Sequence, residues 1–85
     1  MEFHRSAFKH GYDEQTILHA LNRSVTVVDL EPTADPPKML AIGPDHAGNM
    51  VEVIWLQLDG TDLVIHAMAL RPTFHDLLPK GDDLT

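Results

Sequence analysis

The chain has 85 residues, with 13 acidic side chains against 6 basic ones, a formal net charge of −7, six histidines and no cysteine. This length fits one domain, residues 1–85, and the lack of cysteine excludes disulfides, thiolate metal sites and cysteine nucleophiles. No apolar run reaches the ~20 residues of a membrane helix, and the N-terminus lacks a signal-peptide pattern, so we expect a cytoplasmic protein. The negative charge argues against broad nucleic-acid binding but allows a small local basic site.

The first third of the chain is predicted to be helical. Asp13 is a suitable N-cap for a helix that runs to Leu21 or Asn22, since its apolar side chains recur at three- and four-residue spacing. Residues 6–10 are predicted to form a shorter first helix closed by Gly11, because glycine tolerates the positive φ that follows many helix ends.

From Ser24 onward the pattern changes to that of β-strands. Four segments are rich in β-branched or alternating apolar residues: 24–30, 38–42, 50–58 and 63–70. Three prolines make residues 31–37 a loop, and Asp59-Gly60 lies at the tip of a hairpin between the last two strands. Those two strands have apolar residues at odd and even positions, as expected for strands covered on both faces.

The order of the elements predicts an α+β domain. It begins with an N-terminal helix or helices, continues as a four-stranded antiparallel meander, and ends with a short helix that starts at Pro72. Residues 79–85 are predicted to be a flexible tail. The helices are expected to cover one face of the sheet. The other face is also apolar, which predicts a partner protein or a homodimer.

Basic and imidazole side chains gather in three places. His4-Arg5 and Lys9-His10 lie near the N-terminus, His66 and Arg71 lie on and after the last strand, and His75-Asp76 follows in the C-terminal segment. None of the histidine spacings matches that of paired helical metal ligands, and no HExxH sequence occurs. We therefore expect no bound metal ion.

The sequence also lacks the motifs of covalent catalysis and of nucleotide binding. It has no GxSxG, and Gly43 and Gly48 fit neither a dinucleotide fingerprint nor a phosphate-binding loop. No cofactor is expected. What remains is metal-free chemistry on a phosphodiester, which needs a base for the 2′-hydroxyl, a cation for the phosphate charge and an acid for the leaving oxygen.

Two of the three places contain the side chains that this chemistry requires: His10 with Lys9, and His66 with Arg71. Each also has an ordinary structural explanation. His66 fits the edge of the core, and Lys9-His10 fits a helix C-terminus, where positive charge complements the dipole. Arg71 could pair with one of two carboxylates, Asp76 or Glu52.

Three other conspicuous side chains are assigned no functional role. His19 and His46 are interpreted as surface histidines. Trp55 is expected in the core or at an interface, where its indole N–H needs a hydrogen-bond partner if it is buried.

The segment Lys9-His10-Gly11-Tyr12, followed by Asp13-Glu14 and a helix, resembles the segment that opens BrnT-type toxins. These are small ribonucleases of the RelE/ParE superfamily that are encoded beside a DNA-binding antitoxin. Residues 64–72, with Arg71 near the end, are similar to the late strand of the family, which ends in basic residues. The resemblance spans residues 9–72 and depends on these two segments.

The resemblance implies a metal-independent endoribonuclease of a bacterial toxin–antitoxin module. Its predicted catalytic residues are His10, His66 and Arg71, and its predicted RNA- or phosphate-binding residues are Arg5 and Lys9. The expected partners are an antitoxin encoded nearby and an RNA substrate. Two alternatives remain: a non-catalytic dimeric interaction protein, as a degenerate toxin would be, and a toxin that acts by binding a protein target.

Overall fold

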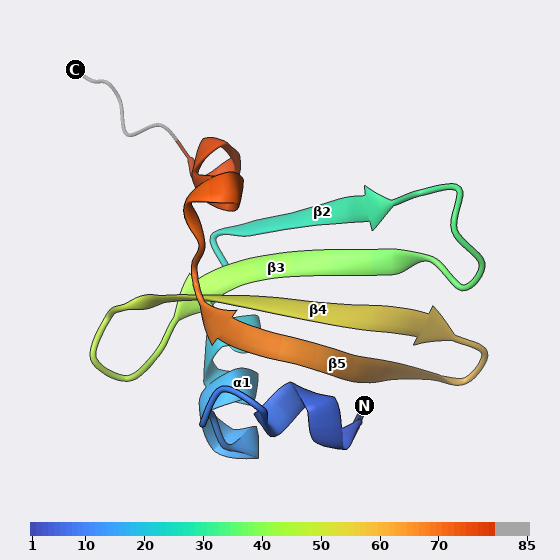
Figure 1. The fold of residues 1–85 in the computed structure, drawn as a ribbon, viewed down its shortest axis with the longest axis horizontal. Coiled ribbons are helices and arrows are strands. Elements are labelled where there is room, and N and C mark those ends of the chain that lie inside the picture. Colours follow the sequence, from blue (N-terminus) through green and yellow to red (C-terminus); the bar gives the residue numbers. More distant parts are fainter. Residues whose placement is uncertain (80–85) are drawn as a thin grey trace.

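The computed structural model describes residues 1–79, which form an α+β domain with a five-stranded sheet (Figure 1). The elements in chain order are β1 (Glu2–Phe3), η1 (Arg5–Phe8), α1 (Glu14–Asn22), β2 (Thr26–Glu31), β3 (Lys38–Pro44), β4 (Met50–Leu58), β5 (Thr61–Ala69) and η2 (Pro72–Leu77). The strand order is β1-β5-β4-β3-β2. Among the described residues, no helix is long and apolar enough to cross a membrane.

The predicted meander is confirmed as β2 to β5, each strand antiparallel to the next. The prediction of four strands was wrong because β1 adds a fifth, parallel to β5. Two residues are too few to show any alternation, so no sequence pattern indicates this strand. The expected first helix is a 3-10 turn, as is the short C-terminal helix. Apart from Pro79, the predicted flexible tail lies outside the described residues.

The helix α1 packs closely on one face of the sheet. The Asp13 carboxylate caps its first turn by accepting the Thr16 backbone N–H at 2.8 Å. A Cβ atom on Gly43 of β3 would lie 1.9 Å from the Ala20 carbonyl oxygen. Glycine at this position therefore allows the helix backbone to approach β3.

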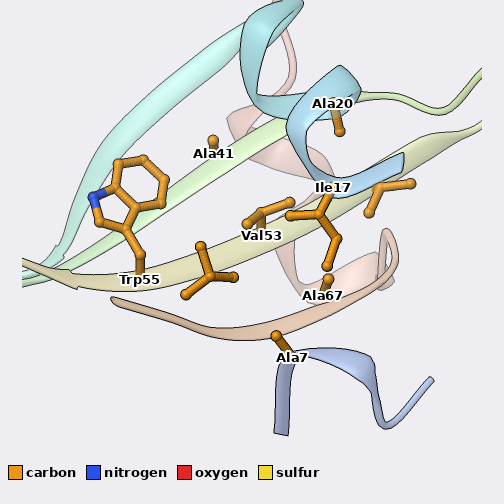
Figure 2. Close-up of a cluster of buried hydrophobic side chains, with 9 residues drawn as sticks. Ala7, Ile17, Ala20, Ala41, Val53, Trp55 and Ala67 are labelled. Atoms are coloured by element: carbon orange, nitrogen blue, oxygen red, sulfur yellow. The ribbon is translucent and has the colours of Figure 1, made fainter. Parts of the chain in front are cut away.

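The core lies between α1 and the sheet (Figure 2). Ile17 and Ala20 of α1 face Val53 of β4, and Ala67 of β5 lies next to Ala7 of η1. Trp55 is 8% exposed, and its ring extends the core over β3. The Trp55 indole Nε1 is buried without a hydrogen-bond partner among the described residues.

The C-terminal segment covers one end of the opposite face of the sheet. Thr26, Ile42 and Glu52 form one row across β2, β3 and β4. The chain crosses these strands on its way from β5 to η2 (Figure 1). At the far end of this crossing, the Thr26 hydroxyl donates to the Leu77 carbonyl oxygen at 2.8 Å.

This arrangement bears on the expectation that a partner protein or a homodimer covers the sheet face opposite α1. Leu40 and Ile42, two apolar residues on that face, are both 0% exposed within the single chain. The apolar character of β3 on this side is thus explained by burial inside the domain, and it does not by itself require a partner protein or a homodimer.

Candidate active site

Glu52 is the only buried charged residue among residues 1–79, at 0% exposure. It lies between two buried valines of β4 and points to the face opposite α1, where Arg71 lies. A carboxylate buried away from water is costly unless hydrogen bonds and opposite charges compensate it. The surroundings of Glu52 supply both.

Arg71 is the main partner of Glu52. Its backbone N–H donates to Glu52 Oε1 at 2.9 Å, while its side-chain Nε and Nη2 donate to Oε2 at 2.9 and 2.6 Å. Arg71 can reach Glu52 because β5 ends at Ala69 and the chain then crosses over β4, with Arg71 in an extended conformation. The guanidinium also lies 5.4 Å from the centre of the Phe74 ring. The Arg71 side chain is thereby fixed, although 44% of its surface is exposed.

His66 is the second partner. Glu52 pairs with Met68 across the two strands, and Ile54 pairs with His66, so that Glu52 and His66 are diagonal neighbours on one face. His66 Nε2 lies 2.8 Å from Glu52 Oε2. Since a carboxylate accepts hydrogen bonds, Nε2 carries the hydrogen. The His66 side chain is 21% exposed and reaches the surface of the domain.

These contacts determine the charge state of Glu52. Burial alone would raise the pKa of Glu52, but the hydrogen bonds from Arg71 and His66 outweigh burial and lower it. The same bonds to Glu52 raise the pKa of Arg71 above its usual value. The cluster therefore contains a carboxylate that stays ionised at neutral pH and a permanently charged guanidinium.

His10 lies against this cluster from the N-terminal segment. Its ring meets the His66 ring edge-to-face, with the centroids 5.7 Å apart. The segment is held there by β1, which pairs with β5, and by Ser6, whose hydroxyl donates to the Ile65 carbonyl oxygen at 2.6 Å. After His10 the chain turns at Gly11, which has a φ of 90°.

The structure thus brings together the three predicted catalytic residues, His10, His66 and Arg71, through contacts with one another or with Glu52. The predicted RNA-binding residues Arg5 and Lys9 are exposed and lie in and just after η1. Neither forms a salt bridge within residues 1–79.

A second pair of imidazoles lies elsewhere in the molecule. The rings of His19 and His46 are 4.0 Å apart, and His19 Nδ1 lies 2.9 Å from the Pro44 carbonyl oxygen. The described part of the chain contains no group of three or more His, Asp or Glu side chains that could hold a metal ion.

Glu52 is the residue that the sequence interpretation left without a function. It was named only as one of two carboxylates that could pair with Arg71, and the structure confirms that pairing. The signal available in the sequence was one acidic residue inside an otherwise apolar stretch from Met50 to Leu56. In a strand covered on both faces, such a residue must have a compensating partner.

Searches with this chain against protein-family models, curated proteins and solved structures find no match.

Proposed function

We propose that this protein is a small metal-independent endoribonuclease of the toxin type, with its active site at His10, His66 and Arg71. The observation that carries the proposal is the contact of two imidazole rings beside a guanidinium that a buried carboxylate fixes. Two imidazole rings, which can serve as base and acid, next to a fixed positive charge are the components that cleavage of a phosphodiester requires.

The chemistry begins at the ribose. One histidine takes the proton of the 2′-hydroxyl, and the 2′-oxygen attacks the adjacent phosphorus. The bond to the 5′-oxygen breaks, and the other histidine supplies a proton to that oxygen. The products are a 2′,3′-cyclic phosphate and a free 5′-hydroxyl, and neither water nor a metal ion is consumed in this step.

Arg71 is suited to the charge that develops on the phosphate. Its Nε and Nη2 bind Glu52, which leaves the hydrogens on Nη1 for a phosphate oxygen. Because the side chain is already held by Glu52 and Phe74, binding of a phosphate requires little ordering of the guanidinium.

Arg5 and Lys9 are proposed to contact the RNA backbone on either side of the cleaved bond. Both are exposed on the segment that carries His10 to His66. A protein with a net charge of −7 repels RNA over most of its surface, so these local cations are expected to make binding strongly dependent on salt. In the cell, the proposed partner is an antitoxin encoded nearby.

The experiment is cleavage of a labelled RNA by purified protein in the presence of EDTA. The wild-type protein is expected to release fragments with 2′,3′-cyclic phosphate ends. Replacement of both His10 and His66 by alanine is expected to lower the rate by about 10²–10⁴-fold. In the matched control, alanine replaces His19 and His46, whose rings form the other pair. This variant is expected to keep wild-type activity.

The same variants test toxicity in growing bacteria. Growth arrest by the wild type and not by the His10, His66 double variant supports the ribonuclease. Arrest by both proteins favours a toxin that binds a protein target, because such binding needs no acid–base pair. RNA left intact, together with unaffected growth, overturns the proposal.

A non-catalytic dimer is the second candidate, and one observation favours it. Val25, just before β2, and Val27 within it are 44% and 53% exposed. Because β2 is an outer strand of the sheet, apolar side chains and unpaired backbone groups are available there to a second copy. This candidate predicts a stable homodimer in light scattering and a mild or absent phenotype for Arg71→Ala and His66→Ala. A monomeric protein excludes it.

A further inference from the structure

Glu52 has no chemical role in the reaction as described so far. Its carboxylate is 0% exposed, and both oxygens already accept hydrogen bonds, Oε1 from the Arg71 backbone and Oε2 from His66 and the Arg71 side chain. A group without exposed surface cannot take a proton from a ribose hydroxyl. Any effect of Glu52 on catalysis must therefore pass through the residues that it binds.

The contact with His66 fixes the form of that imidazole ring. Because Glu52 Oε2 accepts the hydrogen on Nε2, the neutral ring has its lone pair on Nδ1. When Nδ1 takes up a proton, the ring becomes positively charged, and the carboxylate 2.8 Å from Nε2 compensates that charge. The bond to Glu52 thus leaves Nδ1 as the ring atom of His66 that can take a proton.

His10 has different surroundings. It is exposed, and within residues 1–79 no carboxylate is hydrogen-bonded to its ring. Its edge contact with His66 places the two imidazoles next to each other, one held by a buried carboxylate and one facing solvent. Two neighbouring groups in unlike environments are suited to opposite roles as base and acid.

We propose that Glu52 is a positioning residue that makes His66 the base of the reaction. This inference rests on the ribonuclease function proposed above. His66 Nδ1 takes the proton of the 2′-hydroxyl while Glu52 holds Nε2–H, and the new 2′-oxygen–phosphorus bond forms as the bond from phosphorus to the 5′-oxygen breaks. The 5′-oxygen receives its proton from the His10 imidazolium. One proton enters the protein at His66 and one leaves it at His10.

The test combines a spectroscopic readout with kinetics. Long-range ¹H–¹⁵N correlation spectra of the labelled protein show which ring nitrogen of His66 carries the hydrogen in the neutral state, and they need no RNA. The wild type and Arg71→Ala are expected to show hydrogen on Nε2 alone. Glu52→Met removes the acceptor and introduces an apolar side chain of similar length. In this variant His66 is expected to show a mixture of both forms.

The kinetic arm compares Glu52→Met with Glu52→Gln on the RNA substrate. We expect kcat to fall about 100-fold in Glu52→Met and by less in Glu52→Gln, because the amide oxygen still accepts from Nε2 but has no charge. Since Arg71 and His66 are partly exposed, water can solvate them in either variant, which favours a folded protein.

The outcomes separate the two proposals. Wild-type RNA cleavage with an unchanged kcat in Glu52→Met, or hydrogen on Nδ1 of neutral His66, overturns the role of Glu52 and leaves the ribonuclease in place. A wild-type protein that leaves RNA intact overturns the proposed function, and the role of His66 as base falls with it.

Discussion

Two pairs of histidine rings lie in contact within residues 1–79, and their surroundings differ. His10 and His66 meet beside a buried carboxylate and a guanidinium. His19 and His46 lie even closer, with centroids 4.0 Å apart, but the one hydrogen bond of this pair within residues 1–79 joins His19 to the Pro44 carbonyl oxygen. Both pairs depend on contacts between distant segments of the chain.

The difference shows what distinguishes a candidate site from a contact between imidazoles. A carbonyl oxygen orients a ring without adding a full charge, whereas Glu52 orients His66 and also holds a cation next to it. Burial of Glu52 makes that arrangement costly to lose, because the carboxylate would remain in the core without its partners. At the His10–His66 pair, the contacts that stabilise the fold are thus the ones that the proposed reaction uses. At the His19–His46 pair, contacts affect stability alone.

The largest effect on stability is expected from Arg71→Ala. This change leaves Glu52 buried with only His66 and the residue 71 backbone N–H as hydrogen-bond donors. We expect the free energy of unfolding to fall by about 2–4 kcal/mol, near the lower end of values for broken buried pairs. The Arg71 side chain is 44% exposed, so in the variant water can enter the space that it occupied and solvate Glu52 in part.

Urea denaturation measures this change. Arg23→Ala is the matched control, since Arg23 is an exposed arginine at the end of α1, and it is expected to have little effect on unfolding. Equal stability of Arg71→Ala and the wild type would mean that Glu52 does not behave as a buried charge.

Four of the five strands were predictable from the sequence, but the site they support was only partly so. Alternation and β-branched residues located β2 to β5, and Asp13 located the start of α1. The position of His10 depends on the pairing of β1 with β5, which lie far apart in the sequence. A strand of two residues has no recognisable sequence pattern, so this pairing could not be predicted. No local pattern contains that information.

Glu52 was harder to interpret than the three predicted catalytic residues. Its neighbours on β4 are apolar, and its partners His66 and Arg71 come from β5 and the segment that crosses β4 afterwards. The register of β4 and β5 makes Glu52 and His66 diagonal neighbours, and a bulge between Ile54 and Trp55 shifts that register. A sequence shows that such a carboxylate needs a partner, but not which residue supplies it.

A smaller effect is expected when the wild-type protein is taken to low pH. The pKa of Glu52 is lower in the folded protein than its usual 4.5, so its stabilising contribution is complete above that value. The contribution is lost as the pH falls through the folded pKa, because folding then no longer favours the ionised form. Glu52→Met is expected to lose less stability than the wild type between pH 7 and the acid region below 4.5.

Unfolding curves at several pH values measure this difference. The pKa values of Asp13 and Asp45 are also lowered, mainly by backbone hydrogen bonds from Thr16 and Asn49, so some acid sensitivity should persist in Glu52→Met. Identical pH dependence in the two proteins would contradict a lowered pKa at Glu52.

The smallest effect is expected at the second histidine pair. His19→Ala removes the partly buried hydrogen bond to the Pro44 carbonyl oxygen and the ring contact with His46. We expect a loss of about 0.5–1.5 kcal/mol in the free energy of unfolding and no change in RNA cleavage. His46→Ala is the companion variant, because it removes the ring contact and leaves the hydrogen bond of His19 intact. If either variant lowers cleavage as much as His66→Ala does, the contrast between the two pairs is wrong, and the buried carboxylate is not what sets the candidate site apart.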